Sequence, residues 1–355
     1  MVSTSSSSDL TVRGFGVLPP LVGDLEMEKK MSNHQLARFI KVILFMIVSL
    51  MALGAGVRTM NAGLSCPDWP LCFGQVIPDF HPAVWFEFVH RAYAGIVALC
   101  YLICCWMVFR SKTLPKVARK AVVFGLLALG AQIVMGGLTV LLLVKSVIVT
   151  SHLVLATLFF SSVFWLLYIV ESAENPEKNK PPQWFSVLAR VMPILVFAQL
   201  IVGGFVASTY AGSVCVDWPL CNGEWVPTWQ GAIGLQIAHR FFAYGLIVVI
   251  GMVGWVVQRS RQSDGLSWVT PQLLRLSRIN TFMVALQVAV GIANLLLYIP
   301  AHMAVLHQSV GVLLFAVNLR IYFVVAGTTV GVGLTAAKNA KKNIMHGSPH
   351  SSCCS

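Results

Sequence analysis

The sequence predicts an all-α polytopic membrane protein, with eight transmembrane helices arranged as two tandem parallel four-helix bundles. Composition is the first reason: of 355 residues, 57% are hydrophobic and 11% are charged, whereas soluble domains carry roughly 25% charged residues. With a mean hydropathy of +0.78, most of the chain must face lipid rather than water. The other two reasons are a series of eight long apolar runs and an internal repeat. An ordinary soluble globule, a disordered chain and a disulfide-rich miniprotein are excluded.

The eight apolar runs predict the transmembrane helices in chain order. Each is close to the ~20 residues that a helix needs to cross about 30 Å of hydrocarbon. The runs cover residues 39–57, 84–109, 121–144, 146–170, 187–207, 231–257, 279–299 and 303–325. The expected units are a disordered N-terminal cytoplasmic extension (1–38), an N-terminal bundle (39–170), a cytoplasmic linker (171–186), a C-terminal bundle (187–326) and a cytoplasmic tail (327–355).

The basic residues set the expected orientation of these helices. The net charge of +12 would suggest nucleic-acid binding in a soluble protein, but in a membrane protein Lys and Arg gather in cytoplasmic segments. The link 110–120 carries five basic residues and no acid, whereas the links after the first and fifth runs carry Asp68, Asp79, Asp217 and Glu224. Both termini are therefore expected to be cytoplasmic, with the lipid bilayer as a partner and no nucleic acid.

The second half of the chain repeats the first. The motif CPDWPLC at residues 66–72 returns as CVDWPLC at residues 215–221. The pairs at this offset of 149 include Gly54 and Gly203, His90 and His239, and Arg91 and Arg240; those at an offset of 155 are Gln132 and Gln287, Gly136 and Gly291, and His152 and His307. Since each unit has an even number of spans, both units enter the membrane from the same side. This predicts parallel repeats about an axis along the membrane normal.

Four histidines mark the candidate sites. His90, His152, His239 and His307 lie near the outer ends of the second, fourth, sixth and eighth runs. A single histidine there would be read as an interhelical hydrogen-bonding residue, but four at repeat-related positions favour a ligand role. Two imidazoles on alternate helices of a bundle suit the two faces of a planar macrocycle, and imidazole is a haem ligand. A bare metal ion would need further ligands, so we expect up to two haem sites, one in each half.

One substitution separates the two halves. Glu87 lies three residues before His90, on the same helix face, and its repeat equivalent is Gln236. A carboxylate can accept protons or stabilise positive charge, whereas an amide can only form hydrogen bonds. We therefore expect the chemistry in the first half. The alternative is a structural carboxylate paired with Arg91 or Arg58.

Three arginines are candidates for contacts to haem propionates. Arg91 and Arg240 each follow a histidine directly, and a guanidinium forms charge-assisted hydrogen bonds to carboxylates. Arg58, at the end of the first run, is a third candidate, although its equivalent is Ala207. For Arg58 a snorkelling interfacial arginine is an equally good account.

The cysteine pairs in the two outer links suggest disulfides. Cys66 and Cys72, like Cys215 and Cys221, are separated by six positions on the side of the membrane where disulfides persist. Each bond would staple a loop over its bundle. For Cys66 and Cys72 the alternative is electron exchange with a periplasmic thiol protein. A zinc site made of all four would require the two loops to meet.

Together these residues resemble the haem A synthase family, in its bacterial form with cysteine pairs in the outer loops. The resemblance covers roughly residues 38–326 and rests on the motif Glu87-Phe-Val-His90-Arg91, the three later histidines and the cysteine-bearing loops. It implies oxidation of the C8 methyl group of haem O to a formyl group, with water as the oxygen source, to give haem A for terminal oxidases. It also implies a multi-pass protein of the bacterial inner membrane.

The resemblance also implies residue roles and partners. Glu87 would be the catalytic carboxylate, and His90 and His152 would bind the substrate haem. His239 and His307 would be the iron ligands of a haem B cofactor, and Cys66 and Cys72 would form a functional disulfide. Haem O would come from a haem O synthase in the same membrane, and the electrons would pass to an unidentified acceptor.

Two other functions use the same ligands. A bis-histidine membrane cytochrome b would transfer electrons without altering its haems and would not require Glu87. A haem transporter or chaperone would release the haem unchanged. Identification of the haems extracted from the protein separates these functions from haem A synthesis.

Overall fold

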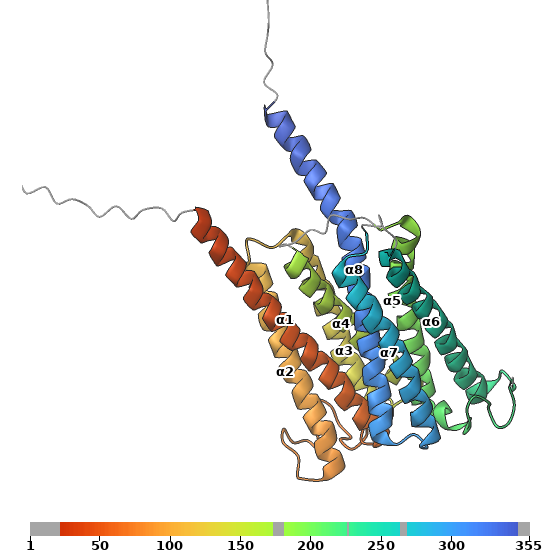
Figure 1. Cartoon of the computed structure of the whole chain (residues 1–355). Helices are drawn as coiled ribbons and strands as arrows, with labels where there is room; N and C mark the ends of the chain where they lie inside the picture. The colour runs from red at the N-terminus through yellow and green to blue at the C-terminus, as the bar shows by residue number, and fades with distance from the viewer. Residues whose placement is uncertain (1–21, 173–180, 226, 263–267, 347–355) are drawn as a thin grey trace, which may run out of the picture.

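The computed structural model describes residues 22–172, 181–225, 227–262 and 268–346, and it confirms the predicted fold class. In this part of the chain, eight helices are long and apolar enough to cross a membrane, and Figure 1 shows them side by side. The helices are α1 (Val22–Thr59), α2 (Pro82–Arg110), α3 (Lys116–Leu141), α4 (Ser146–Ser172), α5 (Gln183–Ser208), α6 (Gly231–Gln262), α7 (Pro271–Leu296) and α8 (Ala301–His346), with a short 3-10 helix at Ala211–Ser213.

The first and last helices extend beyond the predicted spans. Residues 22–38, expected to be disordered, form the start of α1, and α8 continues past residue 325 as far as His346. Both additions lack proline and contain many residues of good helix propensity, so the backbone stays helical after the apolar pattern ends. The spans were predicted from hydrophobicity, which shows where a segment crosses the membrane but not where its helix begins or ends. Residues 1–21 and 347–355 of the two expected tails lie outside the described residues.

The repeat extends to unusual backbone conformations. Left-handed φ values occur at residues that correspond between the halves, and four of these pairs consist of residues other than glycine. The pairs are Asn61 and Tyr210 (φ 54 and 57), Phe73 and Asn222 (54 and 55), Leu143 and Tyr298 (54 and 60), and Val144 and Ile299 (48 and 59). Non-glycine residues adopt this region rarely. The chain therefore turns in the same way at the same places in both halves.

The eight helices form two four-helix units that pack on each other. Within each unit the first helix contacts the second and fourth, and the third contacts the second and fourth. The units meet through α1 against α8 and α4 against α5, which are equivalent contacts, and through α4 against α8. One cluster of buried apolar side chains draws residues from both units. The halves therefore share a core along their interface.

The start of α1 and the end of α8 project from the same end of the bundle (Figure 1). The links after α1 and α5, which carry the cysteine motifs, lie at the opposite end. This is the arrangement expected for repeats with an even number of spans. The cytoplasmic location of the termini stays a prediction from the charge distribution.

Candidate active site

Each of the four histidine rings lies against a glycine of the neighbouring helix. A side chain at these glycines would crowd the ring, because an added Cβ would stand only 2.8–3.3 Å from the ring carbon Cε1. The four contacts are His90 of α2 on Gly54 of α1, His152 of α4 on Gly136 of α3, His239 of α6 on Gly203 of α5, and His307 of α8 on Gly291 of α7. The repeated glycines thus provide the space in which the imidazoles sit.

The histidines are brought together in pairs, as the repeat predicted. The ring centroids of His239 and His307 are 6.4 Å apart, with an angle of 74° between the ring planes. His90 and His152 are close enough to interact electrostatically. All four side chains are half-buried. Each half therefore presents two imidazoles, from its second and fourth helices, to one shared space.

Glutamines contact three of the four histidines. Gln132 and Gln287, at equivalent positions, place Nε2 at 3.2 and 3.4 Å from Nε2 of His152 and His307. Gln199 places its Nε2 3.1 Å from Nδ1 of His239 and also donates to the carbonyl oxygen of His239 at 2.9 Å.

The equivalent of Gln199 in the first half is Leu50, so His90 has no such glutamine. The Gln132 and Gln287 repeat was visible in the sequence, whereas Gln199 has no repeat equivalent to mark it.

The histidine pairs fit haem ligation. The Nδ1 atoms of His90, His152 and His307 are buried without a hydrogen-bond partner among the described residues, and unpaired buried polar atoms of this kind call for a ligand, ion or water. A metal–imidazole bond is about 2 Å long, so rings 6.4 Å apart leave room for one metal atom between them. The donor set is the bis-imidazole type used for haem iron.

Glu87 lies one helical turn before His90 on α2 and is buried, at 6% exposure. It accepts a hydrogen bond from Nε of Arg91 at its Oε1 atom, at 2.9 Å. The pairing with Arg91 anticipated as an alternative is thus present. In the second half Gln236 is equally buried, at 7% exposure, and its Oε1 has no hydrogen-bond partner among the described residues. The two sites therefore differ in charge at this position.

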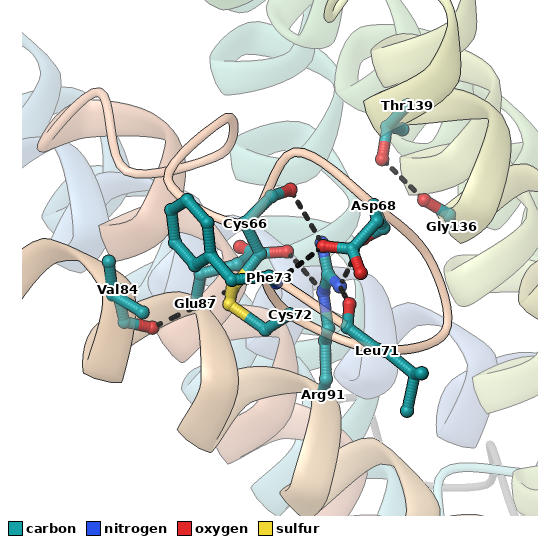
Figure 2. A network of polar contacts seen from close by, with 10 residues as sticks. All are labelled: Cys66, Asp68, Leu71, Cys72, Phe73, Val84, Glu87, Arg91, Gly136 and Thr139. Atoms are coloured by element: carbon teal, nitrogen blue, oxygen red, sulfur yellow. Dashed lines mark hydrogen bonds and ion pairs between the residues drawn. A yellow bond between two sulfur atoms is a disulfide. The ribbon is translucent and has the colours of Figure 1, made fainter. Parts of the chain in front are cut away.

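Arg91 and Arg240 hold the cysteine loops. Arg91 Nη1 donates to the carbonyl oxygens of Asp68 and Leu71, both at 2.8 Å, and Nη2 donates to that of Cys66 at 3.3 Å. Figure 2 shows these contacts converging on one guanidinium. Arg240 likewise donates to the carbonyl oxygens of Leu220 and Cys215, at 2.7 and 3.2 Å. Sequence reasoning missed this role, because loop carbonyls carry no sequence signal.

Arg58 lies between the two halves. Its Nη1 donates to the carbonyl oxygen of Ala207 at 3.1 Å, which is the residue 149 positions later and its own repeat equivalent. Contacts of Arg58, Arg91 and Arg240 to haem propionates stay a prediction. For Arg91 and Arg240 such contacts would compete with the bonds to the loops.

Both predicted disulfides are present. Cys66 is bonded to Cys72 and Cys215 to Cys221, and all four residues are buried. The pairing uses all four sulfur atoms within their own loops, which supports the staple interpretation over a shared zinc site.

An aspartate completes each loop. Asp68 accepts the backbone N–H groups of Phe73 and Gly74 at 2.6 and 2.8 Å, and Asp217 accepts those of Asn222 and Gly223 at 2.6 and 2.9 Å. The bond from Gly74 is the main cause that lowers the pKa of Asp68, and the bond from Gly223 does the same for Asp217. Both carboxylates are therefore stabilised in their charged form.

The first loop also reaches the helix that supports His152. Trp69 lies against Gly137 of α3, where an added Cβ would be 3.1 Å from the indole ring, and the preceding residue Gly136 supports His152. In the second loop, Trp218 instead donates a hydrogen bond to the hydroxyl of Tyr244 at 3.0 Å. Although the loops share a motif, their tryptophans make different contacts.

The fold and the site define a class: multi-pass helical membrane proteins with two tandem four-helix units and a histidine pair in each. The chain belongs to the COX15-CtaA family of cytochrome oxidase assembly proteins, whose family model matches residues 37–83 and 77–319.

Several relatives carry the name haem A synthase. The protein from Shewanella oneidensis is 27% identical over 336 residues, covering 81% of this chain and 96% of the relative. The protein from Shouchella clausii is 34% identical over 218 residues, covering 59% of this chain and 72% of the relative. The protein from Rhizobium etli is 27% identical over 346 residues, covering 82% and 90%.

Proposed function

We propose that this protein is a haem A synthase that oxidises the C8 methyl group of haem O to a formyl group. The observation that carries the proposal is the asymmetry of the two histidine pairs: buried Glu87 stands beside the first, and Gln236 takes its place beside the second. Membership of the COX15-CtaA family and the names of the relatives support the same activity. The protein would act in the bacterial inner membrane with both termini cytoplasmic.

The two histidine pairs have different roles in this proposal. His90 and His152 bind and orient the substrate haem O in the first half. His239 and His307 hold haem B in the second half, and when bound haem B supplies one-electron transfer. The glycines that seat the four rings and the glutamines beside three of them fix the orientation of the imidazoles, as outer partners of metal ligands do.

Glu87 is the catalytic residue. Conversion of the methyl group with one water molecule to a formyl group releases four protons and four electrons. The carboxylate stabilises positive charge that develops at the methyl carbon and accepts protons as water adds. Arg91 occupies Oε1 of Glu87, and Oε2 makes no hydrogen bond to the described residues, so one oxygen is available for this work. A haem O synthase in the same membrane supplies the substrate, and an acceptor that remains to be identified takes the electrons.

The test is replacement of Glu87 by glutamine, which reproduces the second half in the first. We expect Glu87→Gln to keep bound haem and to lower haem A output by ~100-fold or more, because positioned acid–base groups contribute about 10²–10⁴-fold. Haems extracted from the purified protein of cells supplied with haem O are separated by chromatography and identified by mass.

The matched control is Gln236→Glu, which should leave haem A output intact. Normal haem A output from Glu87→Gln would refute the assignment. Haem B alone in every extract, with no dependence on Glu87, would indicate the bis-histidine electron carrier. Haem O recovered unchanged from the wild type would indicate a transporter or chaperone.

A further inference from the structure

One guanidinium joins the first cysteine loop to the glutamate beside His90. Nε of Arg91 donates to Oε1 of Glu87 at 2.9 Å, while Nη1 and Nη2 donate to the carbonyl oxygens of Asp68, Leu71 and Cys66 at 2.8, 2.8 and 3.3 Å. In Figure 2 the side chain of Arg91 leaves the helix and enters the curve of the loop, where these bonds meet. A planar guanidinium with donors in fixed directions transmits the position of one set of acceptors to the other.

The loop side of this junction is constrained. The Cys66–Cys72 disulfide closes it, Asp68 binds two of its backbone N–H groups, and Cys72 and Gln75 exchange backbone hydrogen bonds at 3.1 Å. The carbonyl oxygens that hold Arg91 belong to residues inside the disulfide ring or at its ends. Their positions therefore depend on the disulfide.

The second half provides an internal comparison. Arg240 binds its loop through the carbonyl oxygens of Leu220 and Cys215, but the residue four positions before it is Gln236, whose Oε1 has no partner among the described residues. Anchoring of a loop by an arginine is thus common to both halves. In the first half, where the chemistry is proposed, the arginine also binds a carboxylate, that of Glu87.

We propose that Arg91 is a positioning residue through which the Cys66–Cys72 loop sets the orientation of the Glu87 carboxylate. The inference rests on the proposed role of Glu87. With the disulfide closed, the loop holds the guanidinium, and the guanidinium holds Oε1 of Glu87. The other oxygen, Oε2, is then oriented to accept protons during the reaction. Opening of the disulfide by thiol exchange, with two electrons from a dithiol, releases the loop carbonyls and with them the carboxylate. Loss of orientation on this scale lowers the rate of the chemical step by ~100-fold and leaves haem binding in place.

The first experiment reads the carboxylate directly, without turnover. A water-soluble carbodiimide with an amine labels accessible carboxyl groups, and peptide mass spectrometry reports the labelled fraction of Glu87 in protein free of haem O. We expect labelling of Glu87 to rise severalfold in Arg91→Lys, which keeps the charge but lacks the fork of donors, and in wild type reduced by a membrane-impermeant dithiol. The Cys215→Ser/Cys221→Ser variant should label Glu87 as the untreated wild type does. Labelling of Glu87 that is indifferent to both changes would overturn the proposal.

The second experiment measures coupling during turnover. Arg91→Lys and Cys66→Ser/Cys72→Ser should each lower kcat for haem O by about 100-fold with little change in KM, and the combined variant should be no slower than Arg91→Lys alone, since both act through one contact. Multiplied effects in the combined variant, or a rise in KM with kcat unchanged, would refute positioning. Haem B content reports folding of each variant; where the double serine variant loses it, the reversibly reduced wild type takes its place.

The two proposals fail separately. If Glu87→Gln keeps haem A output, the proposed function is wrong whatever the labelling shows. If Glu87→Gln abolishes output but the loop and Arg91 leave Glu87 labelling unchanged, haem A synthesis stands and the positioning role is wrong.

Discussion

His239 differs from the other three histidines because a glutamine, Gln199, contacts its Nδ1 atom. Nε2 of Gln199 lies 3.1 Å from Nδ1 of His239, and the equivalent position next to His90 is Leu50. A side-chain contact of this kind restricts the orientation of a metal-binding imidazole. The contrast suits a histidine that keeps its haem in the second half and one that exchanges its haem in the first.

Replacement of Gln199 by leucine should therefore weaken haem B retention. We expect Gln199→Leu to lower the affinity for haem B by about 10–100-fold, the usual effect of losing an outer partner of a metal ligand. Haem titration of the depleted protein, followed by absorbance, measures the change. Leu50→Ala is the control in the first half and should bind haem B as the wild type does. Equal affinity in Gln199→Leu and wild type would contradict the role of this contact.

At the scale of the helices, the histidine sites depend on close approach of neighbouring elements. The second and fourth helix of each unit carry the rings, and the first and third carry the glycines that receive them. The sites are therefore formed by helix pairs rather than by single helices. A methyl group on the receiving helix should have the same effect as a change of the ligand itself.

Gly291→Ala tests this dependence in the second half. An added Cβ would stand 2.8 Å from Cε1 of His307, so the ring or helix α7 must shift, at a cost of about 1–3 kcal/mol. We expect the purified variant to lose most of its haem B while keeping its helical circular dichroism. Gly251→Ala in α6 is the matched control, because an added Cβ there meets nothing within 4 Å. Full haem B content in Gly291→Ala would show that the glycine does not shape the site.

At the scale of the whole molecule, a group of charges joins the two units. Glu171 of α4 accepts from Lys41 of α1 and from Arg320 of α8, both at 2.9 Å. The carboxylate thus links a helix of its own unit to the last helix of the other. The Glu171 and Arg320 side chains are each 25% exposed, so each ion pair contributes about 1 kcal/mol at most.

Glu171→Gln should loosen the contact between the units without disturbing either site. We expect a lower apparent Tm in detergent, by about 2–4 °C, and unchanged haem B content. Thermal unfolding followed by tryptophan fluorescence gives the comparison. Glu224→Gln is the control, since exposed Glu224 forms no ion pair with the described residues, and it should unfold as the wild type does. If Glu171→Gln unfolds at the wild-type Tm, these ion pairs do not contribute to the stability of the protein.

Sequence reasoning found the features that repeat or that follow hydrophobicity. The spans were visible because lipid requires long apolar runs, and the histidine pairs because equivalent residues recur at fixed offsets. The far ends of α1 and α8 were missed because helix formation continues where apolarity stops. The bonds from Arg91 to loop carbonyls were missed because any residue type supplies a carbonyl oxygen, and Gln199 because it lacks a counterpart in the first half.

Arg58 and Ala207 occupy equivalent positions in the two units and contact each other where the units meet. Asn61 and Tyr210, also 149 positions apart, form a second contact of this kind, a hydrogen bond of 3.2 Å. In a symmetric pair of identical subunits, every residue that meets its own equivalent meets an identical side chain. A dimer of two chains that each carry the first-half residue would have to place arginine against arginine here. A single chain that carries both units is free of that requirement, and the same freedom permits a glutamate at one site and a glutamine at the other.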